Sequence, residues 1–416
     1  MVKTEMNEFM FKFIKDVCNE IGSRGASSEA EKKAADKIEG IFKEYCNEAS
    51  QEEFELSPMA QLGGIRYNVL LLWGGALFFW LSLLIDHGTL LLEPIYNLVF
   101  LIIGIILVTV PLLFFVGEVL LIYEVVDFLV PKKKSQNVIG IINPSDEAKH
   151  DLIIGAHHDS AHVFNLFYLG TLGAVLIFIG FILIFLISIF VWLKFIFFFI
   201  PVDISAWFDQ FGIMMIIFVP FSAIYLFFVR KTCTLGAYDN LSGVSILLGI
   251  AKCLSEHRNN GVIFPKHTRI KLISFGSEES GLRGSKSYVA KHIKELGNNK
   301  AKLLNIDSIS MKDKIVIVHR ETLSGTKHDK QLSQELVDIG KELGIGIKFG
   351  QLPFGGSDAV PFTRKGIPAT SFMSFEMPKL PSYYHVLNDK PEVIEKESLG
   401  QVLQICLKYI EKNDAL

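Results

Sequence analysis

The chain has 416 residues, half of them hydrophobic, and a formal net charge of −3 at pH 7. This length allows two or three domains, and without a basic stripe we expect no nucleic-acid partner. The five cysteines lie apart with no CxxC pair, and the N-terminal residues are charged throughout, so we expect free thiols and no signal peptide.

The chain opens with two amphipathic patterns, at residues 5–20 and 28–46, which predict helices. Ser28 precedes the second pattern, and Glu31 three residues later completes a capping box. A strand is expected at residues 51–56. We therefore expect these residues to begin a folded α/β domain.

Four apolar runs are each long enough to cross a bilayer, and none contains an internal Asp, Glu, Lys or Arg. They cover residues 68–85, 98–117, 166–193 and 211–229. Their pairing predicts two transmembrane hairpins, with residues 194–210 as the turn of the second. The charged segment 118–130 should extend a helix or lie in the membrane interface.

Both hairpins interrupt one domain, so each must leave and return on the same side of the membrane. The far side carries only Lys194, whereas the domain side carries Arg66, Lys132, Lys133, Lys134, Arg230 and Lys231. By the positive-inside rule we expect a multi-pass cell-membrane protein with a cytoplasmic domain. The expected domain covers residues 1–66, 132–162 and 232–416, and the expected hairpins cover residues 67–131 and 163–231.

Outside the apolar blocks, about 290 residues alternate between strand and helix patterns. Further strands are expected at 136–142, 152–156, 269–275, 302–306, 315–319 and 368–372. Further helices are expected at 242–257, between the strands at 269–275 and 302–306, and at 329–343 and 393–412. Such alternation predicts an α/β fold whose mostly parallel central sheet lies between helix layers.

Metal-binding side chains stand where expected strands end, the edge at which α/β sheets bind ligands. In chain order they are His157, Asp239, Glu279, Asp307 and His385. Glu278 stands beside Glu279, and adjacent carboxylates at a buried strand end repel unless a cation or a shared proton intervenes. Asp159 follows His157 at a spacing that lets a carboxylate hold a metal-bound imidazole. Two zinc ions suit this set, with cobalt or manganese as alternatives.

Simpler interpretations compete for single residues. Asp239 precedes a helix and could be its N-cap, and the Glu278–Glu279 pair could be a solvated turn. We interpret His158 and His162 as structural residues. The proposed metal set is favoured because all its members occur together at strand ends.

The chain resembles the di-zinc aminopeptidases of metallopeptidase family 28, whose relatives include glutamate carboxypeptidase, glutaminyl cyclase and the transferrin receptor. The likeness covers nearly all of the chain outside the apolar blocks. It lies in the segments IGSRGASSEAEKKAADKI, NVIG, GAHHDS, GAYDNLSGVS, FGSEESGLRGS, LLNIDSIS, GGSDAVPFTRKGIPATSF and YYHVLNDKP. It implies the zinc-exopeptidase fold and two zinc ions per chain.

The resemblance also implies a role for each site residue. Asp239 would bridge both metals, His157 and Asp307 would complete one metal site, and Glu279 and His385 would complete the other.

Glu278 would be the general base that takes a proton from the attacking water, and Asp159 would orient His157. The peptide bond between Asp239 and Asn240 would be cis.

The chain departs from the family in two places. Phe354 stands where some family enzymes place a tyrosine that steadies the tetrahedral intermediate, and Tyr383 or Tyr384 could replace it. The second departure is the apolar hairpin between the His157 and Asp239 motifs. Since Asn165 lies six residues after Asp159, the end of the first ligand's motif lies within roughly 20 Å of a span.

We therefore expect an aminopeptidase that hydrolyses N-terminal residues of peptides. The hairpins could give access to apolar or membrane-derived peptide substrates, or they could serve only as a membrane anchor. A carboxypeptidase or dipeptidase on the same metal core remains open. The complete ligand set argues against a glutaminyl cyclase and against a non-catalytic receptor-like homologue. A transporter is disfavoured because the spans carry almost no ionisable groups. The oligomeric state is not readable from the sequence.

Overall fold

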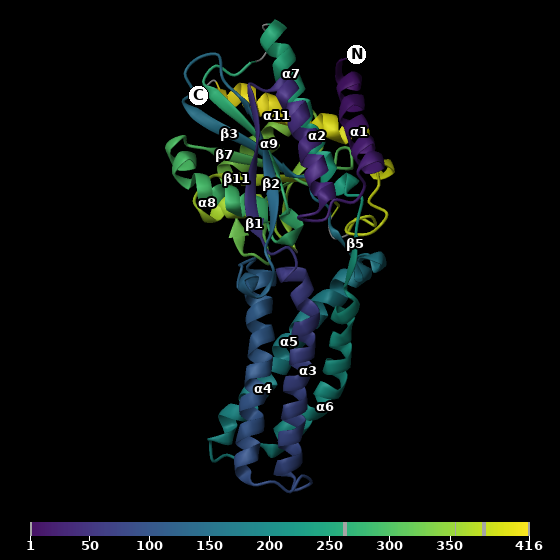
Figure 1. Ribbon diagram of the computed structural model, residues 1–416, viewed down its shortest axis with the longest axis vertical. Helices are drawn as coiled ribbons and strands as arrows, with labels where there is room; N and C mark the ends of the chain where they lie inside the picture. Colours follow the sequence, from purple (N-terminus) through teal and green to yellow (C-terminus); the bar gives the residue numbers. More distant parts are fainter. Residues whose placement is uncertain (1, 261–263, 354, 377–379, 415–416) are drawn as a thin grey trace. The chain divides into compact units, whose positions relative to one another are not determined.

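The computed structural model describes residues 2–260, 264–353, 355–376 and 380–414 of a chain that divides into two compact units (Figure 1). Unit 1 consists of Met1–Pro58, Pro131–Val163 and Lys231–Leu416. Unit 2 consists of Met59–Val130 and Phe164–Arg230, so the chain leaves unit 1 twice and returns to it twice.

Within the described residues, a nine-stranded sheet forms the centre of unit 1. Its strands are β1 (Glu48–Leu56), β2 (Lys133–Ile142), β3 (His150–His157), β6 (Thr268–Phe275), β7 (Lys302–Ile306), β8 (Ile315–Glu321), β9 (Thr326–Lys327), β10 (Ile347–Leu352) and β11 (Ala369–Ser374). The order is β1-β2-β6-β3-β7-β11-β8-β10, with β9 paired to β8. The central strands β6, β3, β7 and β11 are parallel, and antiparallel pairs flank them at β2–β6 and β11–β8. The predicted α/β fold is confirmed.

Helices cover both faces of this sheet. One face packs against α1 (Val2–Glu20), α2 (Glu29–Tyr45), α7 (Ser242–Asn260), α9 (Lys330–Glu342) and α11 (Lys396–Asp414). The other face packs against α8 (Arg283–Asn298) and α10 (Ala359–Arg364). Ile154 of β3 belongs to the first core and its neighbour Ile153 to the second. Because both faces are buried, the central strands are continuous apolar runs in the sequence.

Unit 2 contains four long apolar helices, α3 (Ala60–Asp86), α4 (Pro94–Phe114), α5 (Thr171–Phe198) and α6 (Ser205–Phe221). A π-helical turn continues α4 to Leu120, and a 3-10 turn continues α6 to Phe227. All four stretches are long and apolar enough to cross a membrane. Ile106, Leu113 and Ile217 each expose more than half of their surface, which suits a lipid environment better than water.

The turn of the second hairpin is shorter than the expected residues 194–210, because α5 continues to Phe198 and α6 begins at Ser205. Lys194 therefore lies inside α5, where it is buried and pairs with Asp86 of α3. A local charge pattern does not reveal a partner on another helix. The charge of Lys194 therefore suggests that α5 ends before this residue, whereas the helix continues beyond it.

Segment 118–130 is only partly helical. The π-helical turn includes Glu118 and ends at Leu120, and irregular backbone with one short 3-10 turn follows. Glu118 Oε1 accepts a hydrogen bond from the backbone N–H of Val126 at 2.8 Å, which folds the irregular part back onto the helix end. Two short strands, β4 (His162–Phe164) and β5 (Val229–Cys233), pair with each other where the chain passes between the units.

Candidate metal centre

The predicted site residues gather at the carboxyl edge of the four central strands. His157 is the last residue of β3, and Asp307 directly follows β7. Glu278 and Glu279 lie in a short turn after β6, and the loop after β11 brings His385 to the same edge. Parallel strands end together, so residues far apart in the sequence meet here.

Asp239 lies at the centre of the cluster, in the turn Ala237–Leu241 before α7. Its Oδ1 is 3.1 Å from His157 Nε2, and its Oδ2 is 3.1 Å from His385 Nε2. The carboxylate thus faces two imidazoles, one with each oxygen, which the N-cap interpretation does not explain. Asp307 Oδ1 lies 3.9 Å from His157 Nε2, and Glu279 Oε1 lies 3.7 Å from His385 Nε2.

The two 3.1 Å separations are close to those between ligands of one metal ion, and the 3.7 and 3.9 Å separations are somewhat wider. Two atoms 2.0–2.1 Å from a tetrahedral zinc ion stand about 3.3 Å apart. Ligand atoms of His157, Asp239 and Glu279 all lie within 4.8 Å of one another, as do those of His157, Glu278 and Asp307.

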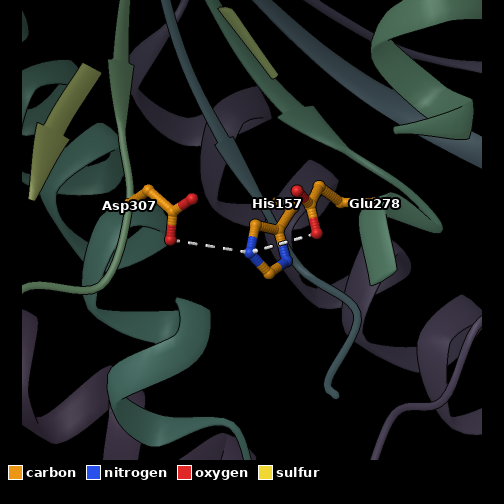
Figure 2. A group of neighbouring side chains, drawn as sticks. All are labelled: His157, Glu278 and Asp307. Carbon is orange, nitrogen blue, oxygen red and sulfur yellow. Dashed lines mark ion pairs between the residues drawn. The ribbon is translucent and has the colours of Figure 1, made fainter. Parts of the chain in front are cut away.

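Glu278 is therefore part of the cluster as well. Its Oε2 lies 3.9 Å from His157 Nε2, and Figure 2 shows Glu278 and Asp307 on two sides of that imidazole. At this distance Glu278 can act either as a ligand or as a base beside the metal, and a mutation separates the two roles.

The site is buried and strongly acidic. Burial raises the pKa of Glu278 well above its usual range, although the nearby His157 cation lowers it. Burial also raises the pKa of Glu279 well above its usual range. Burial would lower the pKa of His157, but the surrounding carboxylates outweigh it and raise that pKa. Glu279 Oε1 is buried without a hydrogen-bond partner among the described residues. Two dications would neutralise this repulsion and use that oxygen, so the donor set fits a metal pair.

Asp159 holds two parts of the site at once. Its Oδ1 lies 3.4 Å from His157 Nδ1, the position expected of a carboxylate that orients the imidazole. The same carboxylate accepts the backbone N–H groups of Glu278 at 2.9 Å and Glu279 at 3.0 Å. The sequence suggested only the contact with His157.

Neighbouring residues fix the turn that carries Asp239. The two carboxylate oxygens of Asp389 accept the backbone N–H groups of Tyr238 at 2.6 Å and Asp239 at 3.2 Å. Asn240 Nδ2 donates to the carbonyl of Ile306, the last residue of β7, at 2.9 Å. The peptide bond between Asp239 and Asn240 is cis, as the resemblance implied.

Arg24 is a supporting residue that sequence reasoning missed. Its side chain is fully buried and makes its described hydrogen bonds to backbone carbonyls of Gly22, His158, Leu235 and Gly236, at 2.8–3.1 Å. It thereby ties the loop after β3 to the loop before Asp239. Its only sequence signal was its place in the family-like segment IGSRGASSEAEKKAADKI.

Asp358 is a second missed residue, and it belongs to the segment GGSDAVPFTRKGIPATSF. It is fully buried, and burial raises its pKa to about 7 although the His157 cation opposes the shift. Its charge also raises the pKa of Glu278, so it adds to the acidity of the site.

Phe354 lies outside the described residues, but both tyrosines considered as its replacement are described. Tyr383 OH shares a hydrogen bond with Ser310 Oγ at 2.8 Å. The ring of Tyr384 packs on the imidazole of His385, with centroids 4.1 Å apart, and burial raises its pKa well above the usual range. Of the two, Tyr384 therefore lies against a site residue.

His158 has the surroundings of a structural residue. Its burial leads us to expect that the free energy of unfolding depends on pH. It is fully buried, with Nδ1 3.0 Å from Ser274 Oγ, and burial lowers its pKa to about 4. The unfolded chain gains a proton near pH 6.5 that the folded chain gains only near pH 4. The free energy of unfolding should therefore fall as the pH drops from 6.5 to 4, by roughly 3 kcal/mol in total.

His158→Asn, whose amide oxygen can still face Ser274, should lose this part of the pH dependence. Melting temperatures of both proteins in detergent between pH 7 and 4.5 provide the measurement. Parallel curves for the wild type and the variant would show that His158 titrates normally.

Comparisons with known proteins identify relatives of this chain. The family model described as Peptidase family M28 matches residues 202–410, a range that begins after His157 and Asp159. Over 173 residues the chain is 31% identical to Aminopeptidase YwaD of Bacillus subtilis (strain 168), covering 40% of this chain and 35% of that protein. Over 172 residues it is 28% identical to Probable glutamate carboxypeptidase VP8 of Zea mays, covering 38% of this chain and 23% of that protein.

The structure also resembles BSAP, a zinc aminopeptidase from Bacillus subtilis, with a TM-score of 0.54 and 15% sequence identity. The match covers 98% of this chain and 95% of that one, and it shows a shared fold. The matches to the two curated relatives span only about a third and a quarter of those proteins.

Proposed function

Because the chain belongs to peptidase family M28, we propose that it is a membrane-bound, zinc-dependent exopeptidase that removes N-terminal residues from peptides. The observation that carries this proposal is the position of Asp239, with one carboxylate oxygen 3.1 Å from His157 Nε2 and the other 3.1 Å from His385 Nε2. A carboxylate placed in this way can bridge two metal ions.

We propose two zinc ions per chain. His157 and Asp307 would complete one site, and Glu279 and His385 the other, with Asp239 shared. Zinc bound there would lower the pKa of a water molecule and polarise the scissile carbonyl. Cobalt or manganese would suit the same ligands.

Glu278 is the proposed general base. It lies beside the ligand atoms, and burial raises the pKa of its carboxyl, so its carboxylate accepts a proton more readily than an exposed one would. It would take the proton of the attacking water and deliver it to the leaving amine. Tyr384, packed against His385, is the proposed hydrogen-bond donor to the tetrahedral intermediate.

A peptide pair distinguishes the exopeptidase classes. We expect the detergent-purified protein with zinc to cleave an apolar peptide with a free amino terminus and to leave its N-acetylated twin intact. Mass spectrometry of the products identifies the end that is shortened. Shortening of both peptides from the carboxyl end would make the protein a carboxypeptidase. Cleavage of neither peptide by zinc-loaded protein would point to a non-catalytic homologue.

We further propose that α3–α6 cross the cell membrane and that unit 1 is cytoplasmic. Support comes from the four apolar helices and from the basic residues at their domain-side ends. The one basic residue expected on the far side, Lys194, is paired with Asp86. Trypsin should cut at the Lys132–Lys134 run in inside-out vesicles and spare it in right-side-out vesicles, and the reverse pattern would overturn the orientation.

Apolar or membrane-derived peptides are the proposed substrates, because an apolar hairpin is inserted between the His157 and Asp239 motifs. In lipid vesicles, kcat/KM should rise along a series of peptides of equal length and increasing hydrophobicity. Equal kcat/KM values along the series would show that the hairpins only anchor the protein and do not select apolar substrates.

A further inference from the structure

Two buried carboxylates from other parts of the chain accept hydrogen bonds from the backbone of the turn that carries Glu278 and Glu279. The backbone N–H of Ser277 donates to Glu31 Oε1 at 2.7 Å, and the next two N–H groups donate to Asp159. The turn begins at Ser277, whose φ is +53°, and is followed by Leu282 with a φ of +62°. Residues other than glycine rarely adopt this left-handed conformation, so the turn depends on such contacts.

Glu31 comes from α2, far from the turn in the sequence, and is 1% exposed. Its Oε1 accepts from both the N–H and the hydroxyl of Ser277, at 2.7 and 2.8 Å. Its Oε2 accepts from the N–H of Ser27 at 2.7 Å and from the hydroxyl of Ser135 at 3.0 Å. Every hydrogen-bonding position of this carboxylate faces a donor, and half of these donors belong to the residue before Glu278.

A capping role alone does not account for these contacts. In a capping box the glutamate accepts the N–H of the N-cap residue and serves only its own helix. Here Ser28 Oγ does accept the N–H of Glu31 at 3.1 Å, but the carboxylate of Glu31 reaches across to the turn after β6.

We propose that Glu31 is a positioning residue of the peptidase site. By holding Ser277, it sets the direction in which Glu278 and Glu279 leave the backbone. Asp159, the other carboxylate on this turn, also orients His157, so it cannot shift to compensate for the loss of Glu31 without moving that imidazole. This inference rests on the proposed function, which assigns Glu278 as the base and Glu279 as a metal ligand.

Glu31→Gln is the first test. The amide keeps the size of the side chain and one accepting oxygen, but its NH₂ group must face a donor of Ser277 or of Ser27. We expect zinc affinity and kcat at saturating zinc each to fall about 10- to 100-fold, the range found when residues that support metal ligands are altered, with KM little changed.

Ser28→Ala is the matched control. It lies in the same first turn of α2 and removes the hydrogen bond to the Glu31 N–H without touching Ser277. If Glu31 serves only as a helix cap, both variants should lower the melting temperature and leave zinc affinity and kcat equal to those of the wild type. Ser277→Ala, which removes one of the two bonds to Glu31, replaces Glu31→Gln if that variant fails to fold. It should lower the same two quantities by a smaller factor.

The measurements are equilibrium dialysis against buffered free zinc and kcat with the free-amino peptide, at a temperature where all variants are folded. A loss of zinc affinity and kcat in Glu31→Gln but not in Ser28→Ala supports the inference. Equal values in the two variants overturn it. If the wild type cleaves no peptide, the proposed function fails, whereas the zinc affinities still decide the role of Glu31.

Discussion

Glu278→Gln is expected to lower kcat by about 10²–10⁴-fold while the protein keeps its zinc and its fold. Glutamine has the size of glutamate but cannot accept the proton of the attacking water. A base beside the ligands contributes little to holding the metal, so zinc content should not change. The measurement is kcat at saturating zinc, together with zinc per chain by atomic emission after dialysis.

Glu279→Gln is the matched comparison, because it changes the next residue of the same turn. Glu279 Oε1 lies 3.7 Å from His385 Nε2 and is expected to bind metal. This variant should lose zinc on dialysis and regain part of its activity in excess zinc. Loss of zinc from Glu278→Gln as well would make Glu278 a ligand, as its proximity to His157 and Asp307 allows.

Arg24→Met is expected to destabilise unit 1 by roughly 3–5 kcal/mol, a large part of the roughly 5–15 kcal/mol that stabilises a typical domain. Arg24 donates to four backbone carbonyls in three chain segments, and methionine would remove this donor from all of them. The bonds to His158 and Gly236 are buried, and the Gly236 carbonyl keeps the N–H of Leu241 as a second donor. Each buried acceptor that loses its partner costs about 1–3 kcal/mol, and part of that sum is offset because a buried charge is removed.

Thermal unfolding in detergent, followed by circular dichroism, tests this expectation. Arg320→Met is the control, since Arg320 is exposed on β8 and its removal should change stability by less than about 0.5 kcal/mol. Equal melting temperatures for the Arg24 and Arg320 variants would show that other donors replace the guanidinium.

The fold of unit 1 could be predicted from the sequence because its signals are local. Apolar runs such as residues 152–156 mark buried strands, and parallel strands bring their carboxyl ends to one edge. Every strand and helix expected in unit 1 is present in the described structure. Strand β10 escaped prediction because it contains Gly350 and all six of its residues are half-exposed or exposed.

The parts of the site that escaped prediction depend on long-range contacts. The capping-box pattern predicts only a local role for Glu31, whereas in the structure its carboxylate accepts hydrogen bonds from Ser277. The hydrogen-bond partners described for the Arg24 side chain are backbone carbonyls, three of the four in distant loops, so a local charge pattern does not reveal them. The charge of Lys194 favours a turn when the sequence is considered locally, because its partner, Asp86, lies on another helix.

Zinc titration of the metal-free protein tests the two-metal assignment most directly. We predict two zinc ions per chain in the wild type, with hydrolysis of the free-amino peptide reaching its plateau at the second. Asp239→Asn should lose affinity for both ions, because its two oxygens face the histidines of both sites. A wild type that saturates at one ion, or an Asp239→Asn variant that keeps both, would contradict a shared bridging carboxylate.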